Sequence, residues 1–264
     1  RRVELENSGF QRDVTVTNIS DAHTDQPNLR GRCAVVTGGT TGIGRAIAVL
    51  LASYGVKVFI CGRDKQHLQD ALARIQEVGE GDGMNVDLAD DEQVEEFFEA
   101  ANAYLGKLDI AVINAAIPAD ALMEIADEGL LYEVATDFTS YLTSAQQAVK
   151  RMKAGSDVVF IGSMSSLSRK PGSSVYVAAK AGVAAFSASL RAELAEKDIK
   201  VGLIEPGFTG ADFQYPEFPP EKQRDLINAD KMLRAEDIAV ATHFMLTQPR
   251  RTAVSHIRVE TRLQ

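Results

Sequence analysis

The chain has 264 residues, with 28 Lys and Arg against 37 Asp and Glu, which gives a formal net charge of −9. Hydrophobic residues make up 45% of the chain and charged residues 25%, a globular composition that argues against a disordered protein. The acidic balance argues against a general nucleic-acid-binding protein, which needs basic residues to neutralise phosphates.

Residues 1–30 are polar, turn-rich and aperiodic, and we expect them to form a flexible N-terminal arm. From residue 31 to residue 264, short apolar runs alternate with amphipathic stretches. In chain order, the predicted elements are a strand at 33–37, a helix at 43–54, a strand at 56–61, a helix at 65–78, a strand at 84–86, a helix at 91–104, a strand at 108–114, a helical region at about 127–153, a strand at 158–161, a helix at 174–196 and a strand at 201–204.

Most of these strands are continuous apolar runs, which is typical of parallel strands buried on both faces. The sequence therefore predicts a single α/β domain over 31–264, a doubly wound Rossmann-type sheet, mainly parallel, with helices on both faces. Residues 211–228 break the alternation, because they are rich in proline and aromatic residues. They follow the carboxyl end of a strand, where open α/β sheets bind ligands, so they form either a substrate lid or a packed surface excursion.

Cysteine usage and hydropathy indicate the compartment. Cys33 and Cys61 lie in apolar runs and are expected to be reduced core residues. No apolar run approaches the ~20 residues of a membrane span, and the first residues lack the apolar segment of a signal peptide. We therefore expect a soluble cytoplasmic protein without a membrane partner.

A glycine-rich turn, Thr37–Gly44, lies between the first predicted strand and the first predicted helix. Glycines allow a tight turn and the close approach of a pyrophosphate, whose charge the helix N-terminus stabilises. The strand–turn–helix context favours a dinucleotide site over a purely structural turn.

Tyr176 and Lys180 are four residues apart in a helical pattern, so their side chains share one face of the helix. An ammonium beside a phenol favours the phenolate and lowers the tyrosine pKa from ~10, which makes the phenol a usable acid/base near neutral pH. Ser163 follows the preceding strand, where its hydroxyl could hydrogen-bond a substrate carbonyl oxygen.

Together these motifs resemble those of the short-chain dehydrogenase/reductase family. The matching residues are Gly38-x-x-x-Gly42-Ile43-Gly44, Asn114-Ala115-Ala116, Ser163 thirteen positions before Tyr176, Tyr176-x-x-x-Lys180 and Pro206-Gly207, in the order and spacing of the compact subfamily. The resemblance covers essentially 31–264. It implies an NAD(P)-dependent oxidoreductase that acts on a small-molecule carbonyl/alcohol pair and forms a homodimer or homotetramer.

The resemblance also implies a role for each matching residue. Tyr176 would be the general acid/base, Ser163 would orient the substrate oxygen, and Lys180 would assist Tyr176 and hold the nicotinamide ribose. Hydride would pass between C4 of the nicotinamide and the substrate carbon. The cofactor-binding residues would be Gly38, Thr40, Thr41, Gly42, Ile43, Gly44, Arg63, Asp87, Leu88, Asn114, Ala115, Ala116, Tyr176, Lys180, Pro206, Gly207 and Thr209.

Two positions depart from the family pattern. Asp137 stands where the family has an Asn, in a region that anchors a water linked to the catalytic lysine. We hypothesise that Asp137 keeps this water and belongs to the catalytic set; the alternatives are an altered proton relay or an ordinary polar helix residue. Ala211 stands where the family has a Thr that holds the nicotinamide amide, and Thr209 or backbone groups could replace it.

The charge after the second strand indicates the cofactor. Gly62 lies near the position where NAD users of the family carry Asp, and Arg63 could pair with the 2′-phosphate of NADP. Arg45 is a second candidate cation, and Asp64 is expected to cap the next helix. We predict NADP(H) in preference to NAD(H), with a solvated Arg63 and an NAD enzyme as the alternative.

A different class of function remains as the second hypothesis, a nucleotide-sensing or regulatory protein that kept the fold and lost turnover. The intact set of Ser163, Tyr176 and Lys180 argues against it. The four histidines are scattered without metal-ligand spacing, so no metal site is predicted.

Overall fold

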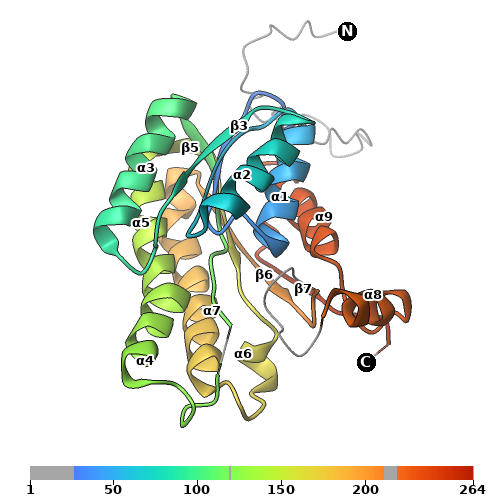
Figure 1. Cartoon of the computed structure of the whole chain (residues 1–264). Coiled ribbons are helices and arrows are strands. Elements are labelled where there is room, and N and C mark those ends of the chain that lie inside the picture. The colour runs from blue at the N-terminus through green and yellow to red at the C-terminus, as the bar shows by residue number, and fades with distance from the viewer. Residues whose placement is uncertain (1–26, 119, 211–218, 264) are drawn as a thin grey trace, which may run out of the picture.

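The computed structural model describes residues 27–118, 120–210 and 219–263, and a sheet runs through the middle of this part of the chain (Figure 1). Its strands are β1 (Cys33–Val36), β2 (Lys57–Gly62), β3 (Gly81–Asn85), β4 (Leu108–Ile113), β5 (Met152–Ile161), β6 (Lys200–Pro206) and β7 (His256–Val259). They lie in the order β3-β2-β1-β4-β5-β6-β7, and every neighbouring pair is parallel.

Helices cover both faces of the sheet (Figure 1). One face carries α1 (Gly42–Ser53), α2 (Lys65–Gln76) and α9 (Ala235–Leu246), and the other carries α3 (Asp91–Leu105), α5 (Ser140–Arg151) and α7 (Ser174–Leu194). The helix α4 (Asp127–Val134) continues into α5 through a π-helical turn, Ala135–Thr139. Two short helices follow strands in the chain: α6 (Ser165–Ser168) comes after β5, and α8 (Pro220–Asn228) comes after β6.

The buried side chains form two cores, one on each face. In β1, Cys33 and Val35 pack toward α3, α5 and α7, whereas Ala34 and Val36 pack toward α1, α2 and α9. Side chains alternate along a strand, so a strand buried on both faces must be apolar at every position. This arrangement confirms the predicted fold class. Cys33 and Cys61 are both buried free thiols, as expected.

Several boundaries differ from those expected. The strand β3 begins at Gly81 rather than at residue 84, and β5 begins at Met152, where the sequence pattern extends a helix to residue 153. The strand β7 is absent from the sequence prediction. It is an edge strand in which exposed His256 and Arg258 alternate with half-buried apolar residues, so it has no continuous apolar run.

Two expected segments are described only in part. Residues 1–26 of the arm and 211–218 of the candidate lid lie outside the described residues. Leu29 is buried in a core, so the packed domain begins before residue 31. Residues 220–228 form α8, with Pro220 in its first turn, so this part of the proline-rich segment is a helix rather than a loop.

The connections from β1 and β4 place the ligand crevice. The two strands are neighbours in the sheet, but β1 leads to α1 on one face and β4 leads to α4 and α5 on the other. A crevice opens at such a switch point, beyond the carboxyl ends of the strands. No helix within the described ranges is both long and apolar enough to cross a membrane.

Candidate active site

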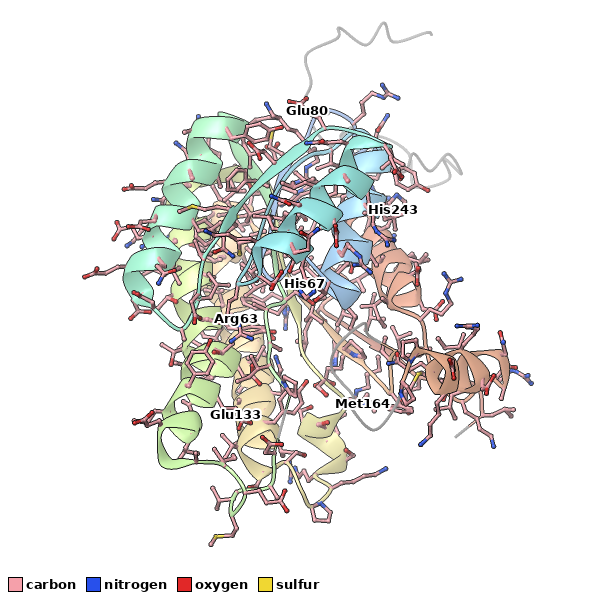
Figure 2. All side chains as sticks on the ribbon, viewed as in Figure 1. Arg63, His67, Glu80, Glu133, Met164 and His243 are labelled. Atoms are coloured by element: carbon pink, nitrogen blue, oxygen red, sulfur yellow. The ribbon has the colours of Figure 1, made fainter. Side chains whose placement is uncertain are left out.

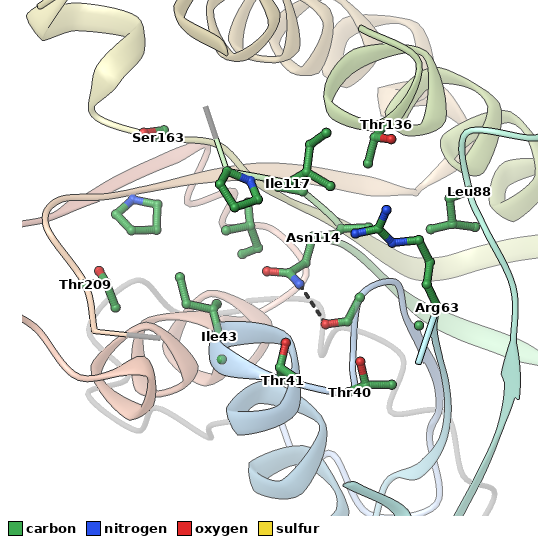
Figure 3. A pocket seen from close by; sticks show the side chains of 18 of the residues that line it. Thr40, Thr41, Ile43, Arg63, Leu88, Asn114, Ile117, Thr136, Ser163 and Thr209 are labelled. Atoms are coloured by element: carbon green, nitrogen blue, oxygen red, sulfur yellow. Dashed lines mark hydrogen bonds between the residues drawn. The ribbon is translucent and has the colours of Figure 1, made fainter. Parts of the chain in front are cut away.

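A cleft of about 400 Å³ opens at the carboxyl ends of the strands, a volume typical of small-molecule sites (Figure 3). It is elongated. Arg63, Leu88 and Thr40 mark one end, and Ser163 and Thr209 mark the other (Figure 3). We call the first the adenosine end, because the sequence predicts that the adenosine part of the cofactor binds there.

The cleft brings together most of the residues that the sequence singles out. Those that line it are Gly38, Thr40, Thr41, Gly42, Ile43, Arg63, Asp87, Leu88, Asn114, Ala115, Ala116, Ser163, Tyr176, Lys180, Pro206, Gly207 and Thr209. Gly44 and Asp137 are buried outside this lining. Arg45 lines a different cavity, between α1, α8 and α9, and is therefore not placed as a second cation in the cleft.

The glycine turn is fixed against the end of β4. Gly38 and Gly42 have φ angles of +63° and +50°, a region that disfavours residues with a side chain. A Cβ at Gly44 would lie 2.1 Å from the carbonyl oxygen of Gly38, so only glycine lets α1 start so close to the turn. The side-chain amide of Asn114 donates to the carbonyl oxygens of Thr37 and Gly38, at 3.1 and 3.2 Å.

The N-terminus of α1 has the features of an anion site. The N-cap residue, Thr41, makes no side-chain capping bond, and the first turn contains no acidic residue. The first N–H groups of the helix thus point at the cleft without a side-chain cap, and the helix dipole adds a partial positive charge. These groups fit a pyrophosphate, as in other dinucleotide sites.

Lys180 is completely buried on α7, one helical turn after Tyr176. Its Nζ donates to Tyr141 Oη at 2.8 Å, and Tyr141 Oη in turn donates to the carbonyl oxygen of Ile161 at 3.0 Å. The same Nζ lies 5.4 Å from the centroid of the Tyr176 ring. The amine is therefore held beside the phenol of Tyr176.

Asp137 lies on the π-helical turn and is also completely buried. Its Oδ1 accepts a hydrogen bond from the backbone N–H of Ile117 at 2.9 Å, and its Oδ2 has no partner among the described residues. Burial raises the pKa of Asp137, and the positive charge of Lys180 opposes this rise. Burial lowers the pKa of Lys180 to about 8, and the charge of Asp137 opposes this fall.

Glu133 lies one turn before Asp137 and is buried as well (Figure 2). Its Oε1 has no hydrogen-bond partner among the described residues. Burial raises the pKa of Glu133, and the nearby charge of Asp137 raises it further. Two buried carboxyl groups thus lie on consecutive turns of this helical region, and one of them, Asp137, interacts electrostatically with Lys180.

Ser163 lies in a loop that is tied to β6. Backbone N–H groups on either side of it, those of Gly162 and Met164, donate to the carbonyl oxygens of Ile204 and Pro206. The Ser163 Oγ accepts a hydrogen bond from the backbone N–H of Ser165 at 3.1 Å. The loop therefore holds the hydroxyl at the end of the cleft opposite Arg63 (Figure 3).

A buried carboxylate strengthens this anchoring. Glu205 Oε1 accepts a hydrogen bond from Ser166 Oγ at 2.6 Å, and its Oε2 lies 2.8 Å from His256 Nε2 and 3.3 Å from Arg258 Nε. The carboxylate is 1% exposed, and each of its two oxygens has a partner. It links the start of the helix after Ser163 to the edge strand β7.

At the adenosine end, Arg63 lines the cleft and its side chain reaches toward α4 (Figures 2 and 3). Arg63 Nη1 donates to Tyr132 Oη on α4, and Tyr132 Oη donates to Asp87 Oδ2 at 2.7 Å. Asp64 accepts from the backbone N–H of His67 at 2.8 Å and caps α2, which confirms the expected cap.

The sequence does not single out several residues of the site, among them Tyr132, Glu133, Tyr141 and Glu205. Tyr132 and Tyr141 lie within long helical patterns, where an aromatic residue indicates packing and gives no sign of its partner. Glu205 carries a usable signal, because a carboxylate at the end of an apolar strand, directly before Pro206-Gly207, needs a buried partner.

Known proteins are similar to this chain over most of its length. A family model described as short chain dehydrogenase matches residues 32–222. The chain is 35% identical to the 3-oxoacyl-(acyl-carrier-protein) reductase FabG of Haemophilus influenzae over 222 residues, which cover 82% of this chain and 91% of that protein. It is 34% identical to carbonyl reductase family member 4 of Danio rerio, over 69% of this chain and 77% of that protein.

A similar fold occurs in a short chain dehydrogenase from Burkholderia cenocepacia whose crystal structure was solved in complex with NADP. The TM-score is 0.79, the sequence identity is 26%, and the match covers 89% of this chain and 98% of that chain.

The buried amine generates a prediction about stability. Lys180→Met is expected to unfold at a higher temperature than wild type near pH 7. A pKa of about 8, against 10.5 for an ordinary lysine, means that the charged amine destabilises the folded state by on the order of 3 kcal/mol. Loss of the hydrogen bond to Tyr141 offsets about 1 kcal/mol of this gain.

The pH dependence follows from the sign of the shift. Between pH 8 and 10.5 the folded state binds fewer protons at this site than the unfolded state, so wild-type stability rises with pH and approaches that of the variant. Calorimetric unfolding near pH 7 and near pH 10 measures both differences. The exposed Lys150→Met provides the control. A Lys180→Met protein no more stable than wild type at pH 7 would contradict the burial penalty.

Proposed function

Because the chain belongs to the short-chain dehydrogenase family, and is therefore an NAD(P)-dependent oxidoreductase, we propose that it transfers a hydride between NADP(H) and a small-molecule carbonyl/alcohol substrate. The observation that carries the proposal is the meeting of the glycine turn, Arg63 and the set of Ser163, Tyr176 and Lys180 in one cleft. The relatives are named reductases, which supports reduction of the carbonyl as the direction of the reaction.

The cofactor residues are proposed from their places in the cleft. The uncapped N-terminus of α1 suits the pyrophosphate, and Asp87 and Leu88 lie at the adenosine end. Pro206, Gly207 and Thr209 line the end that holds Ser163. When bound, the cofactor supplies the hydride from C4 of its nicotinamide.

The chain's own residues move the proton. Tyr176 donates its phenolic proton to the substrate oxygen, so that its O–H bond breaks as the alcohol O–H bond forms. Ser163 donates a hydrogen bond to the same oxygen and holds it in place. The ammonium of Lys180, 5.4 Å from the Tyr176 ring, stabilises the phenolate left behind.

Tyr176→Phe tests the catalytic role. The variant keeps the ring but has no proton to donate, so we expect a loss of about a hundredfold or more in turnover, while NADPH still binds. Carbonyl reduction is followed by NADPH absorbance, and binding is followed by calorimetry. A different result would instead favour the regulatory function: the wild type shows no turnover, and Tyr176→Phe keeps both nucleotide binding and signalling.

The preference for NADP(H) rests on Gly62 and Arg63. A Cβ at position 62 would lie 2.3 Å from Thr40 Oγ1, so an aspartate there would displace Thr40 from the cleft. The chain thus has a cation at the adenosine end and no room for the acidic side chain that selects NAD. A guanidinium pairs well with a phosphate through several charge-assisted hydrogen bonds.

Arg63→Ala is expected to weaken NADPH binding by about tenfold or more, equivalent to ~1.4 kcal/mol, and to leave NADH binding nearly unchanged. The 2′-phosphate is the only chemical difference between the two cofactors, so their ratio isolates it. Calorimetric titrations with both cofactors measure it. Equal losses for both would remove Arg63 from 2′-phosphate recognition and leave an NAD enzyme as the better interpretation.

We also propose that Asp137 acts through Lys180. Its charge keeps the buried amine protonated to higher pH than burial alone would allow. In this role Asp137 is a positioning residue for the proton relay, and it keeps a polar environment where the family pattern has an Asn.

Asp137→Asn generates a prediction on pH dependence. The wild-type kcat/KM for the cofactor is expected to decline above about pH 8, where Lys180 loses its charge. Without the Asp137 charge the pKa of Lys180 falls, so the decline begins at lower pH. The exposed Asp70→Asn serves as control and keeps the wild-type profile. An unchanged rate and profile in Asp137→Asn would remove any special role for this carboxylate.

Assembly into a homodimer or homotetramer is a further part of the proposal. Leu131 on α4 is 74% exposed, and Val134 is exposed on the same helix, which supports an interface there. A cytoplasmic location is supported by the two buried free cysteines.

A further inference from the structure

We propose that Tyr132 determines cofactor specificity, because it holds Arg63 at the adenosine end in position for the 2′-phosphate of NADP(H). This inference rests on the proposed function, in which Arg63 binds that phosphate. Tyr132 is here a positioning residue, since it acts on the cofactor through Arg63.

The contacts of Tyr132 reach across the adenosine end of the cleft. Its hydroxyl accepts a hydrogen bond from Arg63 Nη1 and donates one to Asp87 Oδ2 at 2.7 Å. The Cζ atom of Arg63 also lies 5.6 Å from the centroid of the Tyr132 ring, within the range of a cation–π interaction. Three segments, the ends of β2 and β3 and the helix α4, thus meet at one hydroxyl group.

These contacts reduce the entropy that Arg63 would otherwise lose on binding. Arg63 is exposed, and an arginine side chain that becomes ordered loses up to ~2 kcal/mol of rotamer freedom. A guanidinium already held by a hydrogen bond and a ring loses less. It has five N–H groups, so the bond to Tyr132 leaves donors for the phosphate.

The hydroxyl also separates Arg63 from Asp87. Asp87 Oδ1 accepts from the backbone N–H of Ala89 at 3.0 Å, and Oδ2 accepts from Tyr132, so both oxygens are satisfied without the guanidinium. Burial raises the pKa of Tyr132, and the hydrogen bond to Asp87 raises it further, which keeps the hydroxyl protonated near neutral pH. Without this hydroxyl, Arg63 and Asp87 are free to pair with each other, and Arg63 is then no longer available to bind the 2′-phosphate.

The main test compares Tyr132→Phe with wild type. The variant keeps the ring and removes the hydroxyl, and we expect NADPH binding to weaken by about tenfold while NADH binding changes by less than twofold. Calorimetric titration with NADPH, NADH and adenosine 2′,5′-bisphosphate measures these constants, and the last ligand reports on the adenosine end alone. Thermal unfolding checks that the variant is folded.

A second tyrosine of the chain provides the matched control. The ring of Tyr104 also contacts a cation, because Lys57 Nζ lies 4.1 Å from the ring centroid. Tyr104 Oη also donates to a carboxylate oxygen, Glu80 Oε1, at 3.5 Å. The arrangement resembles that of Tyr132, but it lies at the start of β2, where Lys57 is, whereas Arg63 follows the end of that strand. Figure 2 shows Glu80, the partner of Tyr104, at the opposite end of the sheet from Arg63. Tyr104→Phe is expected to leave all three binding constants unchanged.

The double variant Arg63→Ala/Tyr132→Phe distinguishes the two proposals. If Tyr132 acts through Arg63, the double variant binds NADPH no more weakly than Arg63→Ala alone. An Arg63→Ala protein that keeps the wild-type ratio of NADPH to NADH affinity overturns the proposed role of Arg63. A lowered ratio in Arg63→Ala, together with a wild-type ratio in Tyr132→Phe, overturns the role of Tyr132 and leaves that of Arg63 standing. Equal weakening of both cofactors by Tyr132→Phe also contradicts a role in specificity.

Discussion

The burial of the Lys180 amine is the constraint on which the rest of the site depends. An ammonium out of water is costly unless it is paired and hydrogen-bonded. Here the compensation comes from the hydroxyl of Tyr141 and the carboxylate of Asp137, which lie on α5 and on the π-helical turn before it. Burial still lowers the pKa of Lys180 to about 8, so its charged form is less favourable in the fold, where it is held beside Tyr176, than in water.

The two ends of the cleft use charge in different ways. Lys180 and Asp137 are buried, so the charge of one acts strongly on the protonation of the other. The adenosine end is open to solvent, where an isolated charge is screened and weakly directed. There Arg63 gains its direction from Tyr132 instead, through a hydrogen bond and a ring contact.

The fold and much of the cleft follow from local sequence patterns. Most strands contain short apolar runs, the glycine turn carries its own backbone requirement, and Tyr176 and Lys180 share a helix face because they are four residues apart. Contacts between distant segments have no such local signal. Tyr132 lies 69 positions from Arg63 and Tyr141 lies 39 from Lys180, so only the folded chain shows what each hydroxyl contacts. The strand β7 is hidden for another reason, since pairing with β6 decides its conformation rather than its own polar sequence.

The π-helical turn Ala135–Thr139 fits an extra residue between α4 and α5 without turning one helix relative to the other. If this turn relaxed to an α-helix at constant chain length, α4 would rotate by about 100° against α5. Asp137 would leave Lys180, and Tyr132 would leave Arg63 in the same movement. The contact of Asp137 with Lys180 and that of Tyr132 with Arg63 therefore both depend on the phase of a single helix.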